Sequence, residues 1–271
     1  MPFAIYKNRG ETPLECLERL KKLRPECAAQ KLSYAGRLDP LAEGVLVVLV
    51  GDECKSPVRE KFLGLDKTYR LKILFGISTD TYDVLGLITS LAFVNVDPVS
   101  STIEISVEKI LLNFIGREHG LKYPPYSSKT IDGTSLFSLA KAGEIDDADL
   151  PAITGEIHSI GLVAFGGGEK IAWVDGKNLL KFVDADIDSV HGDFRQDEIR
   201  KKWYEMLQAS EQNPKNAEIK FPIIEIEVKC QSGVYMRSLA HDIGKSIGVP
   251  ALAYSIVRTQ VGDMTIDDCL R

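Results

Sequence analysis

The sequence predicts an α+β fold built around a substantial mixed sheet. Two segments, 69–75 and 224–230, alternate apolar and polar residues, which is typical of strands with one face in water. Two others, 14–23 and 235–247, carry apolar residues at intervals of three and four, which is the spacing of helices. Strands and helices do not alternate regularly along the chain, so a parallel α/β fold is not expected.

The first helix is predicted from its capping signals. Thr12 can cap the helix, Pro13 suits its first position, and Glu15 completes a capping box. Leucines then recur every third position, so the helix should end near residue 23. The next element is the apolar run 45–50, whose composition indicates a fully buried strand.

The later elements follow the same two periods. They are a helix over 107–114, a strand over 126–131 and a helix over 136–141. The helix over 235–247 should end at Gly248, because glycine commonly ends helices and Pro250 follows soon after.

Residues 166–221 form the irregular part of the sequence. Three glycines open this segment, and a run of aspartates precedes a polar helix predicted over 197–208. We interpret the segment as an insertion or lobe of unknown role. The main domain would then consist of residues 1–165 and 222–271.

The composition is that of an ordinary soluble protein, with 44% apolar and 27% charged residues. The net charge of −6 argues mildly against a general nucleic-acid binder, because such domains are usually basic. The five cysteines form no C-x-x-C pair and the four histidines form no H-E-x-x-H motif, so we expect neither a metal site nor a disulfide framework. Glycine motifs that bind nucleotide cofactors are also absent from the sequence, so no cofactor is expected.

The sequence indicates a cytoplasmic protein with reduced thiols. Residues 1–10 lack the long apolar segment of a signal peptide. The longest apolar run, 45–50, is far too short to cross a bilayer, so no membrane partner is expected.

The stretch 34–44 is the most informative about function, and it reads Tyr-Ala-Gly-Arg-Leu-Asp-Pro-Leu-Ala-Glu-Gly. It places Asp39 on a loop bounded by glycine and proline that runs directly into the buried strand. Such loops often carry catalytic groups, because the rigid strand holds them in place. The alternative is a structural Asp-Pro turn, which is common before strands.

This stretch resembles the catalytic loop of the TruB family of pseudouridine synthases. The family pattern is G-H-T-G-T-L-D-P-x-A-x-G, followed by an apolar strand and G-(D/E)-A-T-K. The matching residues here are Gly36, Leu38, Asp39, Pro40, Leu41, Ala42 and Gly44, with Gly51, Asp52 and Lys55 after the strand. Asp39 falls on the nucleophile of the family.

Four further segments resemble family motifs in the same order. Lys67-Thr68-Tyr69-Arg70 resembles K-x-Y-x, residues 76–86 resemble G-x-x-T-D-T-x-D-x-x-G, residues 126–137 resemble Y-S-A-x-K-x-x-G-x-x-x-Y with Phe137 for the tyrosine, and residues 232–244 resemble G-T-Y-I-R-(S/T)-x-x-x-D-L-G. Ile256, Arg258, Thr259 and Gly262 then match the L-x-R-T-x-x-G strand. Asp80 and Asp83, within the second segment, are interpreted as turn residues and not as catalytic ones.

The resemblance covers roughly residues 3–165 and 222–271 and implies the pseudouridine synthase fold. That fold is a large mixed, mainly antiparallel sheet flanked by helices, with a central cleft. The implied reaction detaches uracil from its ribose at N1, rotates it, and rejoins it through C5. It needs neither a metal nor a cofactor.

The resemblance assigns the nucleophile to Asp39, because a carboxylate can both form and release a covalent bond. The attack would fall on C6 of the base or on C1′ of the ribose, and the sequence leaves both open. Arg237 matches the family's cationic partner, which would orient the carboxylate with two hydrogen bonds and favour its ionised state.

The resemblance also implies the residues that bind the substrate. A uridine in folded RNA must be flipped out, and Tyr69 would then stack on it, contributing about 1–3 kcal/mol. Ile256 would form the opposite apolar wall, and Tyr235 comes from the same motif as Arg237. Lys129 would contact either phosphate or only solvent. Without the family context, a tyrosine on a strand face is more often part of the core.

Two loop residues depart from the family pattern. Tyr34 replaces a histidine that is usually linked to opening the RNA loop, so it would intercalate differently or not at all. Arg37 replaces a threonine and would add a phosphate contact or a second cation beside Asp39. The sequence ends soon after Gly262, so we expect no C-terminal PUA RNA-binding domain.

Basic residues gather in the motif segments, which favours a basic cleft on an acidic body. They are Lys31, Arg37, Lys55, Lys67, Arg70, Lys129, Arg237 and Arg258. We therefore expect a monomeric TruB-like pseudouridine synthase that acts on RNA, with the T-loop uridine at tRNA position 55 as its substrate.

Three alternatives stay open at this point. The first is a relative that modifies another RNA, and the second is an RNA-binding chaperone that folds tRNA without catalysis. A pure chaperone, however, has no need of the Asp39 carboxylate. The third is a protein-interaction role for the segment 166–220.

Overall fold

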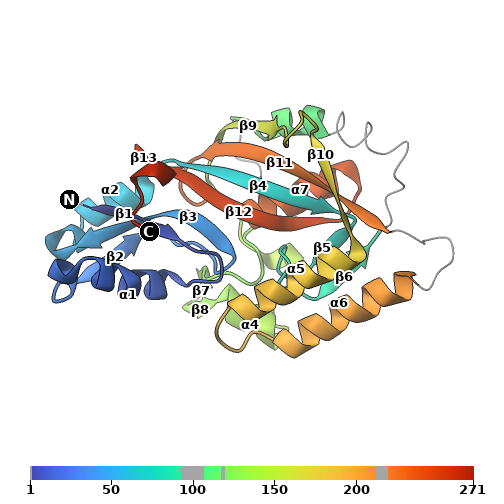
Figure 1. Cartoon of the computed structure of the whole chain (residues 1–271), viewed down its shortest axis with the longest axis horizontal. Helices are drawn as coiled ribbons and strands as arrows, with labels where there is room; N and C mark the ends of the chain where they lie inside the picture. Colours follow the sequence, from blue (N-terminus) through green and yellow to red (C-terminus); the bar gives the residue numbers. More distant parts are fainter. Residues whose placement is uncertain (1, 93–106, 117–119, 212–218) are drawn as a thin grey trace.

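A nine-stranded sheet forms the centre of the computed structural model, which describes residues 2–92, 107–116, 120–211 and 219–271. The strand order is β1 (Phe3–Lys7), β3 (Ala42–Val50), β12 (Ala251–Val261), β4 (Lys67–Phe75), β11 (Lys220–Cys230) and β10 (Ile171–Asp175) (Figure 1). Three more strands extend it: β2 (Leu32–Ala35) pairs with β3, β9 (Ile157–Val163) with β11, and β13 (Met264–Thr265) with β12. The β3–β12 pair is parallel and the other pairs are antiparallel, so the predicted mixed, mainly antiparallel sheet is confirmed.

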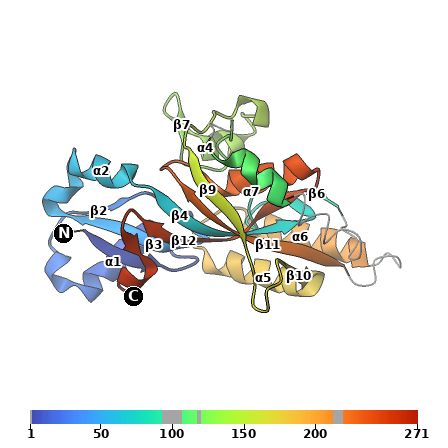
Figure 2. The same cartoon turned by 90° about the horizontal axis from the view of Figure 1, so that it is seen from above.

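Helices cover both faces of this sheet, as Figure 2 shows. Leu71, Ile73 and Phe75 of β4 point to one face and share a core with α7 (Met236–Ile247). Leu74 points to the opposite face, where it packs with α5 (Gly176–Ser189) and α6 (Gln196–Glu211). The alternation predicted for this strand therefore separates two cores at Leu74, whereas Arg70 and Lys72 keep the rest of that face in water, with side chains 38% and 41% exposed.

The strand β3 is buried on both faces, which explains its continuous apolar run. Leu46 and Val48 pack against α1 (Pro13–Leu23), whereas Val45, Val47 and Leu49 pack on the side of α2 (Val58–Gly64). The capping box predicted for α1 is present, because Thr12 accepts a hydrogen bond from the Glu15 amide while the Glu15 carboxylate accepts one from the Thr12 amide.

Short elements complete the described chain. They are the strands β5 (Ile77–Thr79), β6 (Ile88–Leu91), β7 (Thr130–Ile131) and β8 (Thr134–Ser135), the helix α4 (Leu136–Ala142), and the 3-10 helices Pro25–Cys27, Gly51–Cys54, Leu112–Phe114, Asp147–Asp149 and Ile266–Asp268. The helix predicted over 107–114 is present as α-helix over 107–111, continued by a 3-10 turn.

The strand predicted over 126–131 is wrong for its first four residues, since only β7 is extended and paired. The carbonyls of Ser127 and Lys129 instead accept hydrogen bonds from the amides of Phe137 and Leu136, at the start of α4. The backbone of this segment is therefore satisfied by a helix terminus and not by a strand.

The segment 166–221 is more regular than the sequence predicted. It supplies β10 at the sheet edge and the helices α5 and α6, and Trp203 of α6 is fully buried, with its indole N–H donating to the Gly86 carbonyl over 3.0 Å. The helix α5 was missed because its aspartates alternate with a stripe of Leu179, Val183 and Ile187 at four-residue spacing. The division of the chain into a catalytic domain and an insertion stays a prediction.

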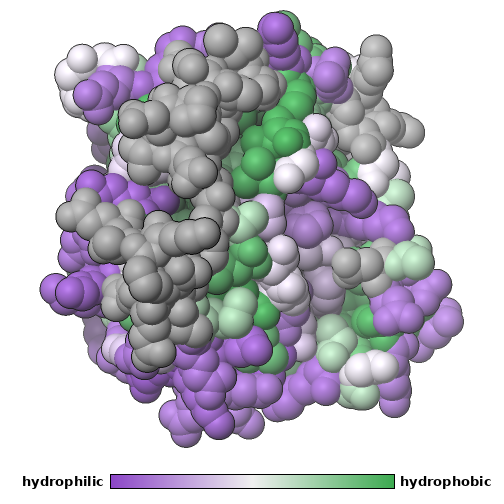
Figure 3. All heavy atoms as spheres, turned by 90° about the vertical axis from the view of Figure 1, so that its right-hand side faces the viewer, coloured by the Kyte–Doolittle hydropathy of each residue, from purple (hydrophilic) through white to green (hydrophobic). Residues whose placement is uncertain are grey.

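On the face in Figure 3, most of the described residues are polar, and apolar residues lie between them, which is ordinary for a protein surface. Among the helices in the described ranges, none combines the length and the apolar character that a bilayer crossing needs.

We predict that Gly44→Ala destabilises the fold. Gly44 has φ of +107° and pairs with Arg258 across the parallel β3–β12 contact, where an added Cβ would lie 2.2 Å from the Arg258 carbonyl oxygen. Backbone strain and steric overlap together should lower the free energy of unfolding by about 3 kcal/mol or more, measured by urea unfolding. Gly161→Ala in β9 is the control, because an added Cβ there meets nothing within 4 Å. Equal losses in both variants would contradict this account.

Candidate active site

Asp39 lies on the loop between β2 and β3, at the rim of the sheet. Leu38 before it is buried, and the Ala42 amide donates a hydrogen bond over 3.0 Å to the Asp39 carbonyl, which makes a tight turn. Asp39 thus lies just before the buried strand β3, and its backbone is held by buried Leu38 on one side and by the turn on the other. Its side chain is 34% exposed.

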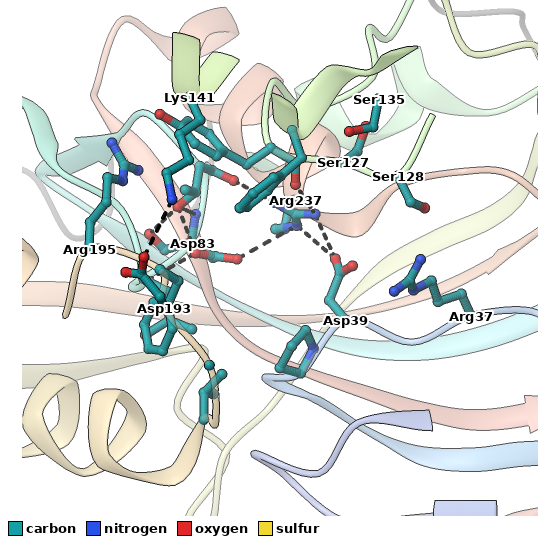
Figure 4. Close-up of a pocket in the computed structure, with 18 of the residues that line it drawn as sticks. Arg37, Asp39, Asp83, Ser127, Ser128, Ser135, Lys141, Asp193, Arg195 and Arg237 are labelled. Atoms are coloured by element: carbon teal, nitrogen blue, oxygen red, sulfur yellow. Dashed lines mark hydrogen bonds and ion pairs between the residues drawn. The ribbon is translucent and has the colours of Figure 1, made fainter. Parts of the chain in front are cut away.

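Arg237, in the first turn of α7, holds the Asp39 carboxylate (Figure 4). Its Nε and Nη2 both lie 2.8 Å from Oδ2 of Asp39. The predicted pairing is present, but the two nitrogens converge on one oxygen instead of spanning both. Within the described part of the chain, no hydrogen bond to Oδ1 accompanies the two contacts to Oδ2.

Arg237 also ties the site to two other segments. Its Nη1 donates to the Thr81 carbonyl over 2.9 Å and its Nη2 to the Tyr126 carbonyl over 3.2 Å, while Nε lies 3.6 Å from Oδ2 of Asp83. Its side chain is only 5% exposed. Burial alone would lower the pKa of Arg237, but the charges of Asp39 and Asp83 outweigh it and raise that pKa.

Asp83 belongs to the site, although the sequence placed it only in a turn. Its Oδ1 accepts hydrogen bonds from the Thr81 hydroxyl at 2.7 Å and the Leu85 amide at 3.0 Å. Burial raises the pKa of Asp83 above its usual value, against the opposing effect of Arg237. The two hydrogen bonds to Oδ1 hold the Asp83 carboxylate so that Oδ2 lies beside the Arg237 guanidinium. The spacing T-D-T-x-D does not reveal that contact.

Two cavities meet at the Asp39–Arg237 pair. The smaller has a volume of about 190 Å³, and the residues lining it include Gly36, Lys67, Tyr69, Ser128, Tyr235, Ile256 and Arg258. The larger has a volume of about 500 Å³, and the residues lining it include Thr81, Asp83, Tyr126, Ser127, Phe137, Lys141 and the loop 190–195 between α5 and α6. Arg37 lines both cavities and is exposed.

Tyr69, Tyr235 and Ile256, which the resemblance assigned to substrate binding, line the smaller cavity together. Tyr69 is buried, and burial raises the pKa of its phenol, which stays neutral. Ile256 pairs with Leu71 and therefore lies on the same sheet face as Tyr69, diagonally across from it. Its place on the opposite side of the base stays a prediction. Both side chains belong to the same apolar cluster and line the smaller cavity.

Two predicted residues do not line either cavity. Tyr34 on β2 packs with the apolar cluster of β1, β3 and α1. Lys129 is exposed and lies with its Nζ 5.2 Å from the centre of the Tyr123 ring. Their roles in RNA binding stay predictions.

Buried cations hold the backbone of the Asp39 loop. Arg258 donates to the carbonyls of Gly36 at 3.1 Å and Val45 at 2.7 Å, on either side of Asp39. Lys7 is fully buried and donates from Nζ to the carbonyls of Pro40 at 2.9 Å and Ala42 at 2.6 Å.

The predicted basic cleft is smaller than the count of basic residues suggested. Arg237 and Arg258 are buried and engaged as described above. Lys67 is also buried, and its Nζ donates to the carbonyls of Leu63 and Leu65. These three cations organise the site from within and are not exposed to an RNA backbone.

The large cavity has a wall that the sequence did not reveal. On the loop between α5 and α6, Arg195 forms an ion pair of 2.8 Å with Asp80 and lies 4.4 Å from the centre of the Tyr126 ring. Nζ of Lys141 in α4 lies 3.6 Å from Oδ2 of Asp193, and Figure 4 draws this ion pair in the large cavity. The predicted insertion therefore contributes directly to the surroundings of Asp39.

Fold and site together place a carboxylate, fixed by a buried arginine, beside two cavities at the rim of a mixed sheet. The family model "TruB family pseudouridylate synthase (N terminal domain)" matches residues 24–174 of the 271 residues. This is more than half of the chain, and the chain therefore belongs to the TruB family of pseudouridylate synthases.

Curated relatives agree with this assignment. The chain is 26% identical over 266 residues to tRNA pseudouridine synthase B of Aquifex aeolicus, covering 98% of this chain and 70% of that protein. It is 27% identical over 267 residues to the protein of the same name from Staphylococcus saprophyticus, covering 98% of this chain and 68% of that one.

Among solved structures, a chain in the crystal structure of a Cbf5-Nop10-Gar1 complex has the same fold. The TM-score is 0.52 and the identity is 17%, with 97% of this chain and 49% of that chain covered. The chain therefore spans about half the length of that protein, and the similarity concerns the fold alone.

We predict that Lys7 makes the stability of the protein rise with pH above neutrality. Burial lowers the pKa of Lys7 from 10.5 to about 8. Between those values the unfolded chain binds a proton that the folded chain has released, so raising the pH favours the folded state. From pH 8 to 10.5, the unfolding free energy of the wild type should gain up to about 3 kcal/mol over that of Lys7→Met.

Urea unfolding at a series of pH values measures this difference. Other groups that titrate in the same range contribute alike to both proteins and cancel. Parallel pH profiles for the two proteins would show that Lys7 is not held with a lowered pKa.

Proposed function

We propose that this protein is a tRNA pseudouridine synthase whose nucleophile is Asp39 and whose substrate is the T-loop uridine at tRNA position 55. The observation that carries the proposal is the Asp39–Arg237 pair, in which two nitrogens hold one carboxylate oxygen of a residue that lines both cavities. Family membership and the names of the curated relatives support the same activity and substrate.

The reaction is an isomerisation that needs no external oxidant or reductant. The Asp39 carboxylate forms a bond to the substrate, at C6 of the base or C1′ of the ribose, and releases it later. The N1–C1′ bond breaks, the C5–C1′ bond forms, and C5 loses its proton while N1 gains one. Arg237 keeps the carboxylate oriented throughout, because the guanidinium is itself fixed by three other groups.

We place the flipped uracil in the smaller cavity, against the apolar wall of Tyr69 and Ile256. Because Tyr69 lines this cavity, its ring would offer a stacking face to the base. The larger cavity would take the ribose, its phosphates and neighbouring nucleotides. Its volume of about 500 Å³ is in the usual range of ligand sites.

RNA binding in this proposal depends on exposed cations near the cavities and not on net charge. Arg37 is exposed where the two cavities meet, so it is the first candidate for a phosphate contact. Lys129 stands nearby on the segment that precedes α4. We further propose that the protein works as a monomer in the cytoplasm.

Tritium release from C5-labelled uridine in T-arm transcripts tests the activity. The wild type should release tritium, and Asp39→Ala should release none above background, because the nucleophile is lost. Asp39→Asn is the isosteric companion and should be equally inactive, since an amide does not attack carbon in this way.

Other outcomes would redirect the proposal. Release by Asp39→Ala at the wild-type rate would exclude Asp39 as the nucleophile. RNA binding without release by the wild type would indicate a different RNA substrate. Accelerated tRNA refolding by both proteins, without release, would favour the chaperone.

We predict that Ser127→Ala weakens substrate binding without loss of stability. Ser127 lines the large cavity, is 4% exposed, and within the described residues its hydroxyl has no hydrogen-bond partner. A buried hydroxyl without a partner costs free energy, so a ligand that bonds to it gains affinity. KM for the RNA should rise about 2- to 10-fold, with the midpoint of urea unfolding unchanged or raised. An unchanged KM would remove Ser127 from the substrate site.

A further inference from the structure

The helix α5 belongs to the segment that the sequence marked as an insertion, yet it carries a buried ion pair with the N-terminal region. Nε and Nη2 of Arg9 lie 2.7 Å and 2.6 Å from the two carboxylate oxygens of Asp186. The Asp186 side chain is only 6% exposed and that of Arg9 is 20% exposed. The pair is a bidentate arginine–carboxylate pair, which fixes the orientation of the two groups as well as the distance between them.

The same guanidinium reaches the Asp39 loop. Nη1 of Arg9 donates to the carbonyl of Leu41 over 3.1 Å, two residues after Asp39, and Nη2 donates to the carbonyl of Tyr254 over 3.2 Å. The Arg9 guanidinium carbon lies 5.0 Å from the centre of the Phe182 ring, so α5 contacts it by a second side chain. The Arg9 guanidinium therefore contacts α5, the Asp39 loop and β12 at the same time.

The backbone next to Arg9 is also pressed against α5. Gly10 has φ of +83°, and an added Cβ there would lie 2.7 Å from both the carbonyl and the hydroxyl oxygen of Ser189. The Gly10 amide donates over 2.9 Å to the carbonyl of Pro40, the residue after Asp39. Two successive residues thus connect the end of α5 to the two residues that follow the proposed nucleophile.

We propose that Asp186 is a positioning residue for the Asp39 loop: it fixes Arg9, and Arg9 fixes the backbone at Leu41. The inference rests on the proposed function insofar as it concerns catalysis. It gives the α5 segment a role in the chemistry, since displacement of a reacting group by about 1 Å can cost on the order of 100-fold in rate.

Stability alone is a weak explanation for this pair. A buried ion pair often contributes little to stability compared with apolar residues of the same volume, because both charges must leave water. Here the Arg9 guanidinium instead binds three groups, namely the Asp186 carboxylate and two backbone carbonyls. Burial by itself would lower the pKa of Arg9, and the Asp186 carboxylate reverses this, so the guanidinium stays charged.

The test compares Asp186→Asn with Asp188→Asn. Asp188 is on the same helix, but its side chain is 73% exposed and pairs with Arg200 at the surface. For Asp186→Asn, kcat for tritium release from the T-arm transcript should fall about 10-fold, with KM for the RNA within about 2-fold of wild type. Asp188→Asn should keep the wild-type values. A wild-type kcat in a folded Asp186→Asn protein would overturn the proposal.

A second background tests whether Asp186 acts through Arg9. In Arg9→Met, where no guanidinium remains to be oriented, Asp186→Asn should lower kcat no further, so the two effects should not add. Full additivity would overturn the proposal. If Asp186→Asn alone fails to fold, Arg9→Met/Asp186→Leu removes both buried charges and supplies the folded protein for comparison, with the same fall in kcat expected.

Hydrogen exchange gives a readout that needs no RNA and no activity. The Ala42 amide donates to the Asp39 carbonyl, so its exchange reports on the loop. We expect the Ala42 amide to exchange faster in Asp186→Asn than in the wild type, and at the wild-type rate in Asp188→Asn. This expectation holds even if the protein proves to modify another RNA. Unchanged exchange would overturn the positioning role, whereas lack of tritium release by the wild type would overturn only the proposed function.

Discussion

The burial of one guanidinium, that of Arg237, is the interaction on which the rest of the site depends. It joins α7, the Asp39 loop, the turn at Thr81 and the segment at Tyr126. Taking such a charge out of water is costly, and the two carboxylates of Asp39 and Asp83 offset that cost. The same contacts leave one oxygen of Asp39 unengaged. A single set of bonds therefore both compensates for the buried charge of Arg237 and fixes the Asp39 carboxylate.

A sequence shows periodicity and motif order well, and burial poorly. The helix and strand periods of α1, β4 and α7 gave their positions, and the motifs located Asp39, Arg237 and Tyr69. The sequence could not show which cations would be internal, because a lysine or arginine looks the same whether it meets water or a backbone carbonyl. The helix α5 was missed for another reason, since its aspartates separate the apolar residues Leu179, Val183 and Ile187 that form its buried stripe.

The acidic net charge and the proposed RNA substrate are compatible once the cations are sorted by exposure. Lys7, Lys67 and Arg258 are buried and serve the backbone, so they add little to the field outside the protein. The exposed cations near the cavities, such as Arg37, are few but stand where a phosphate would pass. Recognition would then depend on shape and local contacts, and binding should be sensitive to salt.

The parallel pairing of β3 with β12 has a consequence for how the molecule is made. Arg258 bonds to the carbonyl of Val45, which lies 213 residues earlier in the chain. Contacts of such long range form late, after most of the chain entropy has been lost. During synthesis, the Asp39 loop would lack this anchor until Arg258 has emerged from the ribosome. A truncated chain would therefore carry the motif of the enzyme but not its working geometry.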